Sequence, residues 1–159
     1  MSENSLSDNP FRLPLKPAWL ATVAERLLGL SPLARAYEQR PEKTHAAQFL
    51  DFTLTALGVT VRHRDELAIK AVPSEGALLA VANHPFGGLE GVAIARELIR
   101  CRPDLKVLTN SMLLSISELQ EIFIGVDVLS EKAAAANAGG LKQALRHIRK
   151  GGALLIFPA

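Results

Sequence analysis

The sequence predicts an α/β fold: a sheet of mixed, largely parallel strands layered with helices and preceded by an N-terminal helical region. Three observations lead to this prediction. Beyond about residue 58, short apolar runs alternate with longer segments of helical periodicity. Most of these runs are continuous, which is typical of strands buried on both faces of a parallel sheet. The chain has 159 residues, 48% of them hydrophobic, and is therefore long enough to bury a substantial core.

Residue patterns divide the chain into three parts. Residues 1–16 are polar and interrupted by proline, and they are expected to form a flexible N-terminus. Residues 17–58 have helical periodicity and are expected to form the N-terminal helical region. Residues 59–159 contain the alternating strands and helices, and they are predicted to form the α/β part of the chain.

An apolar stripe lies early in the helical region, within residues 17–35. It consists of Trp19, Leu20, Val23, Leu27 and Leu30, with Arg26 and Arg35 nearby. A stripe of this kind either packs on its own domain, which is the more common case, or lies in the interface of a membrane. The sequence leaves both interpretations open.

A second helix is predicted at the end of the helical region. Thr44 is a suitable N-cap, because its hydroxyl can accept a hydrogen bond from a free N–H group of the first turn. Gly58 is a suitable stop, since glycine readily adopts the left-handed conformation that ends many helices. The residues expected to face the core are Ala47, Leu50, Leu54 and Leu57.

The α/β part is expected to begin with two antiparallel strands, because residues 59–63 and 66–72 have alternating apolar positions. Further strands are predicted at 77–82, 104–110, 124–129 and 152–158. Helices are predicted at 89–100, 111–123 and 137–151. The residues of the first of these helices that are expected to face inward are Leu89, Val92, Ala93 and Ile99.

A polar turn, NHPFGG at 83–88, connects the strand at 77–82 to the next helix. Ligands bind at the carboxyl ends of strands in open α/β sheets, so His84 occupies a position suited to a functional residue. Pro85 favours an extended backbone at His84. The glycine pair at the end of the turn permits a tight bend and a close approach of a ligand to the main chain.

Glu90 lies in the first turn of that predicted helix. The helix dipole stabilises a carboxylate there, which is a purely structural explanation of its presence. The functional interpretation is that Glu90 accepts a hydrogen bond from one imidazole nitrogen of His84 and fixes the tautomer. The other nitrogen can then take a proton from a substrate hydroxyl. Because the strand end, the glycine pair and the carboxylate coincide, the sequence favours a catalytic histidine.

These residues resemble a known family. NHPFGGLEG at 83–91 is similar to the histidine-containing first block of the glycerolipid acyltransferases, the lysophospholipid acyltransferase superfamily, and in particular to its hemolysin-like and ornithine-lipid-type bacterial branch. IFIGVDVL at 122–129 resembles the second block, and GGALLIFPA at 151–159 resembles the start of the block written FPEG. The resemblance covers about residues 67–159. It implies that this part is the N-terminal portion of an acyltransferase domain that is truncated here.

Two features differ from the family pattern. The usual first block reads H-x-x-x-x-D, whereas five residues separate His84 from Glu90. The second block commonly supplies an arginine to the phosphate of the acceptor, whereas this chain has Asp127 in that neighbourhood and no arginine. The sequence therefore does not favour a phosphate-bearing acceptor.

The resemblance implies transfer of a fatty acyl group from an acyl thioester, on coenzyme A or acyl carrier protein, to a hydroxyl of a lysolipid or related lipid acceptor. His84 would be the general base, and Glu90 would orient it and stabilise the imidazolium. The expected substrate-binding residues are Asn83, Pro85, Gly87, Gly88, Phe157 and Pro158. No metal and no cofactor is implied, because the thioester is a substrate.

Composition narrows the expected partners. A formal net charge of +2 and a single Trp and a single Tyr argue against a nucleic-acid partner. We expect a cytoplasmic protein that is peripheral to the inner face of the membrane, with the membrane surface, the lipid acceptor and acyl carrier protein as partners. The alternative is a non-catalytic lipid-binding or acyl-chain-binding module that has an acyltransferase-like fold.

Overall fold

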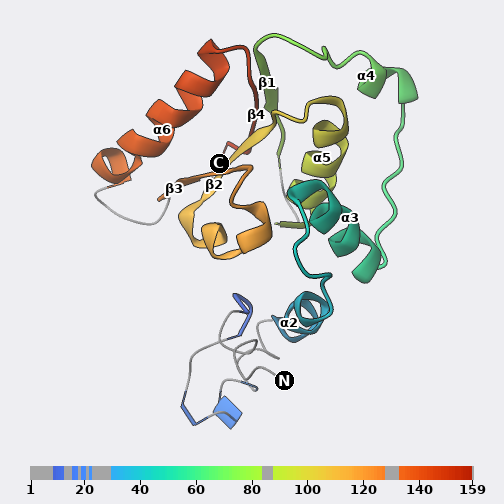
Figure 1. Ribbon diagram of the computed structural model, residues 1–159, viewed down its shortest axis with the longest axis vertical. Coiled ribbons are helices and arrows are strands. Elements are labelled where there is room, and N and C mark those ends of the chain that lie inside the picture. Colours follow the sequence, from blue (N-terminus) through green and yellow to red (C-terminus); the bar gives the residue numbers. More distant parts are fainter. Residues whose placement is uncertain are drawn as a thin grey trace.

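The computed structural model describes residues 9–12, 16–17, 19–20, 22, 30–83, 88–127 and 133–158 (Figure 1). One sheet is formed by the strands β1 (Leu78–Val81), β2 (Lys106–Asn110), β3 (Phe123–Val126) and β4 (Ala153–Ile156). Its strand order is β1-β4-β2-β3, and every pairing between these strands is parallel. The predicted α/β class with a largely parallel sheet is therefore confirmed.

Helices cover both faces of the sheet (Figure 1). The helices α3 (Ala46–Ala56) and α5 (Gly88–Cys101) lie on one side, and α6 (Ala133–Arg149) lies on the other. Successive residues of a strand point to opposite faces, so Leu155 joins the core beneath α3 and α5, whereas Leu154 joins a smaller core beneath α6. Burial of a side chain of this size stabilises the fold by roughly 1.5–3 kcal/mol.

The predicted limits of α3 are nearly those observed. The cap is His45 rather than Thr44, and the first helical N–H group, at Ala46, donates a hydrogen bond of 2.8 Å to Oε1 of Glu121. A distant carboxylate therefore satisfies this helix end, which moves the start by one residue. Gly58 has φ +66° and ends the helix as predicted. The buried residues are Ala46, Phe49, Leu50 and Leu54, with Ala47 and Leu57 partly exposed.

The predicted antiparallel strands are wrong. Residues 59–63 form no regular secondary structure, and Glu66–Lys70 form the short helix α4. The reason is local, because Oδ1 of Asp65 accepts a hydrogen bond of 2.9 Å from the N–H group of Leu67 and so caps the first turn. Leu67, which an apolar strand pattern would bury, is 71% exposed.

The predicted helix at 111–123 is also wrong. Two 3-10 turns, η1 (Ser111–Ser115) and η2 (Ser117–Leu119), replace it and precede β3. Ile116 between them has an extended backbone, with φ −83° and ψ 99°, and therefore interrupts any longer helix. In α5, Leu89 is exposed rather than buried, because the core-facing stripe is centred on Ala95 and Leu98.

An ion pair between a buried arginine and an exposed aspartate joins the amino ends of three strands. Arg102 is 1% exposed, and its guanidinium donates two hydrogen bonds of 2.8 Å to the carboxylate of Asp104. The same guanidinium donates to the carbonyl oxygens of Pro73 at 3.2 Å and Gly151 at 2.9 Å. Asp104 also accepts a hydrogen bond of 3.2 Å from the N–H group of Ala153. The segments that enter β1, β2 and β4 are therefore tied to one buried cation.

Gly140 allows α6 to approach β3 closely, and Gly125 allows η1 to approach the same strand. A Cβ atom on Gly140 would overlap the carbonyl oxygen of Gly125, and a Cβ atom on Gly125 would overlap the side chain of Leu114. In contrast, a Cβ atom on the neighbouring Gly139 would meet nothing within 4 Å. The packing of α6 against the sheet thus depends on the absence of a side chain at Gly140.

A membrane-crossing helix must be both long and apolar. Among the helices in the described ranges of the chain, none has the length and hydropathy needed to cross a bilayer.

The ion pair predicts a pH dependence of stability. Hydrogen bonds from Arg102 hold the pKa of Asp104 below its usual value, so the pair contributes stability above about pH 4, the usual pKa of an aspartate, and this is lost as pH falls further. The Asp104→Asn variant should be less stable at neutral pH and should lose part of the acid sensitivity. Urea unfolding between about pH 3 and pH 7, monitored by circular dichroism, measures both effects. The exposed Glu42→Gln variant is the control, and identical pH profiles for Asp104→Asn and wild type would contradict the assignment.

A matched pair of glycine variants tests the packing of α6. Alanine in place of a helical glycine stabilises a helix by roughly 0.5–1 kcal/mol, so Gly139→Ala should raise the free energy of unfolding. Gly140→Ala has the same gain in helix propensity but inserts a methyl group against the Gly125 backbone, and it should destabilise the protein by roughly 1–3 kcal/mol. Equal stability of the two variants would show that α6 does not pack closely at Gly140.

Candidate functional site

The carboxyl ends of β1 and β4 lie side by side. Val81 at the end of β1 pairs with Ile156 at the end of β4, and the N–H group of Ala82 donates a hydrogen bond of 3.1 Å to the carbonyl oxygen of Ile156. Asn83 therefore leaves the sheet next to Phe157. Two segments that are far apart in the sequence, and that both carry motif residues, begin at one edge of the sheet.

The helix α5 begins at this edge. Gly88 is its first residue and is exposed, and a Cβ atom there would meet nothing within 4 Å in the described structure. Glu90 lies in the first turn, where the positive end of the helix dipole stabilises a carboxylate. Its side chain is half-buried, and its Oε2 atom is buried. The carboxylate is thus held against the protein at the edge where β1 ends.

Phe157 links β4 to the start of α5. A Cβ atom on Gly91 would lie 3.8 Å from Cε2 and from Cζ of Phe157, which is ordinary van der Waals contact. The ring is half-buried and packs against the main core. Pro158, the next residue, is exposed. Phe157 therefore forms an apolar wall one residue away from Glu90, and sequence reasoning placed it in the site without foreseeing this contact.

The structure describes some of the predicted site residues and not others. Asn83, Gly88, Glu90, Phe157 and Pro158 lie at the shared edge of β1 and β4. His84, Pro85 and Gly87 lie outside the described residues. The hydrogen bond between His84 and Glu90 accordingly stays a prediction. In the helical stripe, Val23 and Leu27 also lie outside the described residues, whereas Trp19 and Leu20 are exposed.

The second motif follows β3, at the same carboxyl ends of the strands as the candidate site but three strand positions away from β1. Asp127 comes directly after β3, and strands spaced about 4.8 Å apart place β3 roughly 14 Å from β1. The side chain of Asn137 in α6 accepts a hydrogen bond from the N–H group of Asp127 and donates one of 2.7 Å to its carbonyl oxygen. Sequence reasoning missed Asn137, although a lone amide in a run of alanine and glycine could have drawn attention.

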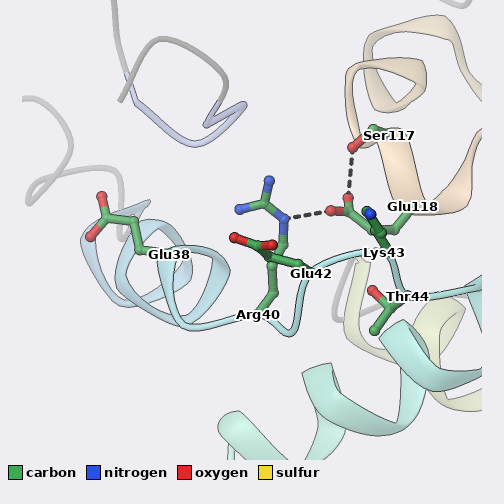
Figure 2. Close-up of a pocket in the computed structure, with 7 residues that line it drawn as sticks. All are labelled: Glu38, Arg40, Glu42, Lys43, Thr44, Ser117 and Glu118. Atoms are coloured by element: carbon green, nitrogen blue, oxygen red, sulfur yellow. Dashed lines mark hydrogen bonds and ion pairs between the residues drawn. The ribbon is translucent and has the colours of Figure 1, made fainter. Parts of the chain in front are cut away.

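A separate polar cleft lies between the connection from α2 (Leu30–Glu38) to α3 and the turn η2. Figure 2 shows its lining and the contacts of Glu118 with Arg40 and Ser117. The cleft has a volume of about 570 Å³ and is lined by Glu38, Arg40, Glu42, Lys43, Thr44, Ser117 and Glu118. It contains none of the predicted site residues.

The charges in this cleft serve to fasten α2 to η2. Arg40 forms an ion pair with Glu118 and lies 3.7 Å from the centre of the Tyr37 ring, and the Tyr37 hydroxyl donates a hydrogen bond of 2.8 Å to Glu118. Burial raises the pKa of Tyr37. Burial also raises the pKa of Glu118, but the hydrogen bonds that its carboxylate accepts, led by that from Arg40, outweigh this effect and leave the pKa below its usual value. The charged residues of this cleft therefore hold the protein together, and we do not assign them to the candidate site.

A protein-bound metal ion needs several His, Cys, Asp or Glu side chains that converge on one point. In the part of the chain that the structure describes, no group of these side chains is suited to hold a metal ion.

Comparison with known proteins assigns the chain to a family. The searches against curated proteins and against solved structures gave no match. A family model described as Acyltransferase matches residues 14–159, a span that contains both motif segments at the shared edge of β1 and β4. The chain therefore belongs to an acyltransferase family.

Proposed function

We propose that this protein transfers a fatty acyl group from an acyl thioester to a hydroxyl of a lysolipid or related lipid acceptor, with His84 as the general base. The observation that carries the proposal is the pairing of β1 with β4, since it brings Asn83, the first residue of NHPFGG, next to Phe157. Membership of an acyltransferase family supports acyl transfer as the reaction.

The proposed reaction has two steps. The imidazole of His84 takes the proton of the acceptor hydroxyl as the oxygen attacks the thioester carbonyl, which gives a tetrahedral oxyanion. N–H groups at the start of α5 are proposed to stabilise that oxyanion, because the first N–H groups of a helix have no partner within the helix itself. The intermediate then expels the thiolate, which takes the proton back from the imidazolium. The products are an ester and a free thiol.

Glu90 supports this role of His84. A carboxylate next to the ring favours the charged imidazolium and fixes which nitrogen carries a proton. Two observations are consistent with this: the side chain lies in the first turn of α5, and its Oε2 atom is buried rather than extended into water. Five residues separate His84 from Glu90 in the sequence, one more than in the usual block.

The shared edge also suits an apolar substrate. Phe157 supplies an apolar wall against Gly91, and exclusion of water by such a wall strengthens the electrostatic interactions of the reacting groups. Asn83, Pro85, Gly87, Gly88 and Pro158 are the further residues proposed to contact substrate. Acyl-coenzyme A and acyl carrier protein are the proposed donors.

The acceptor is proposed to lack a phosphate at the reacting end. The second motif contains no arginine, and its Asp127 follows β3, three strand positions away from β1, with its backbone hydrogen-bonded to Asn137. On the resemblance of NHPFGGLEG, we propose that the chain belongs to the hemolysin-like or ornithine-lipid-type branch of the family. A place at the cytoplasmic face of the membrane would suit the proposed donors and acceptor.

The role of His84 is tested by its removal. With acyl thioester and lysolipid as substrates, His84→Ala should lower kcat by roughly 10²–10⁴, the usual contribution of a general base, and leave the melting temperature near that of wild type. Release of free thiol measures the rate. His63→Ala is the control, because His63 is exposed and pairs with Glu97 away from the site. Full activity of His84→Ala would overturn the assignment, and absence of transfer by wild type would favour a lipid-binding module.

The role of Glu90 is tested by an isosteric change. Glu90→Gln should lower kcat roughly 10-fold to 100-fold, which corresponds to about 1.4–2.7 kcal/mol of lost transition-state stabilisation. Loss of the negative charge lowers the pKa of a neighbouring histidine, so the acidic limb of the rate profile should move to lower pH. An unchanged rate and pH profile would show that Glu90 only stabilises the helix start. The exposed Glu42→Gln variant should match wild type in both measurements.

A further inference from the structure

The two ends of the strands differ in the charge of the segments that form them. At the amino ends of the strands, a cleft of about 420 Å³ is lined by Pro103, Asp104, Leu105, Lys106, Glu121, Ile122 and His147. In contrast, residues 76–89, 107–117 and 151–159 contain no Asp, Glu, Lys or Arg. These three segments supply the carboxyl ends of β1, β2 and β4 and the residues that extend directly beyond those ends. We call the carboxyl-end parts of these three segments the uncharged edge; the charged residues Glu90, in α5, and Asp127, after β3, lie beside it.

Apolar side chains are exposed at this uncharged edge. Met112 and Leu113, in η1 directly after β2, are 70% and 38% exposed. Val81 ends β1 and Leu89 lies in the first turn of α5, and both are exposed as well. These large apolar side chains thus face solvent at the edge where the thioester and the acceptor are proposed to meet.

Several backbone polar groups of η1 form hydrogen bonds within the protein and so do not require water as a partner. The N–H group of Met112 donates a hydrogen bond of 3.0 Å to Oδ1 of Asn110, and its carbonyl oxygen accepts one of 2.8 Å from the Ser115 hydroxyl. The carbonyl oxygen of Leu114 accepts one of 2.8 Å from Gln120. Backbone groups that are already paired can leave water at low cost, so the Met112 side chain can enter an apolar medium.

We propose that η1, through Met112 and Leu113, is a lipid-contacting turn that docks the uncharged edge of the sheet on a bilayer surface. A lipid surface fits this edge because an apolar, uncharged face matches the acyl-chain boundary of a bilayer, whereas a charged protein partner would find no charge to pair with. The inference rests on the proposed function in one respect, since docking brings the candidate site to a lipid acceptor.

The absence of charge gives the docking a recognisable signature. Surfaces that bind membranes through Lys and Arg require anionic lipids and release them in salt. Docking through Met112 and Leu113 should instead occur on phosphatidylcholine vesicles, change little when phosphatidylglycerol is added, and persist in salt.

The test compares vesicle binding of three forms of the full chain. Wild type should sediment with phosphatidylcholine vesicles, and the Met112→Ser/Leu113→Ser double variant should bind at least about tenfold more weakly, equivalent to about 1.4 kcal/mol. The control is Leu67→Ser, which removes a similarly exposed leucine from α4 and should bind as wild type does. Circular dichroism verifies that all three forms are folded.

Activity separates this inference from the proposed function. If both hold, the double variant loses turnover on acceptor in vesicles and keeps wild-type turnover on a short-chain acceptor dissolved as monomers. If no form transfers acyl groups but the binding difference is found, the docking surface stands and the proposed function fails. Equal binding of the double variant and wild type would overturn the docking surface. That result would also be seen if the protein bound vesicles through the exposed Trp19 instead. Absence of wild-type binding, with pairing of two copies in solution, would also overturn it.

Discussion

The fold depends on the buried guanidinium of Arg102 and its ion pair with Asp104. Arg102 is bound by Asp104 and by the carbonyl oxygens that precede β1 and β4, so one guanidinium sets where three strands begin. Strands that begin at fixed positions and run parallel also end at fixed positions. A buried cation without its partners is very unfavourable, so these segments can separate only if Arg102 becomes accessible to water.

The candidate site depends on this constraint at the opposite ends of the same strands. The register of β1 and β4 places Asn83 beside Phe157, and the contact of Phe157 with Gly91 places the wall next to Glu90. None of these residues needs to be close in sequence, because the parallel sheet brings them together. The ion pair of Arg102 and Asp104 lies at the amino ends of the strands, whereas the segments that follow β1 and β4 carry no Asp, Glu, Lys or Arg up to Leu89 and Ala159.

The sequence predicted those elements whose signals are local and strong. The four strands of the sheet are short apolar runs, and α3, α5 and α6 have clear helical periodicity, so their approximate positions were predicted correctly. The segments 59–72 and 111–123 were not, because a side-chain cap from Asp65 and the extended Ile116 outweighed weak periodic patterns. The roles of Arg102, Glu121 and Asn137 depend on distant partners and have no local signal. Motif resemblance supplied the candidate site residues, but the contact of Phe157 with Gly91 required the structure.

The central claim is that the segments directly after β1 and β4 form one acyl-transfer site, and hydrogen exchange tests it most directly. Exchange would be monitored by mass spectrometry with and without a non-reactive acyl thioester analogue. The account predicts that the analogue slows exchange in peptides that span residues 81–91 and 155–158 together, and leaves the cleft around Arg40 and Lys43 unchanged. Protection of that cleft, or of only one of the two segments, would contradict it.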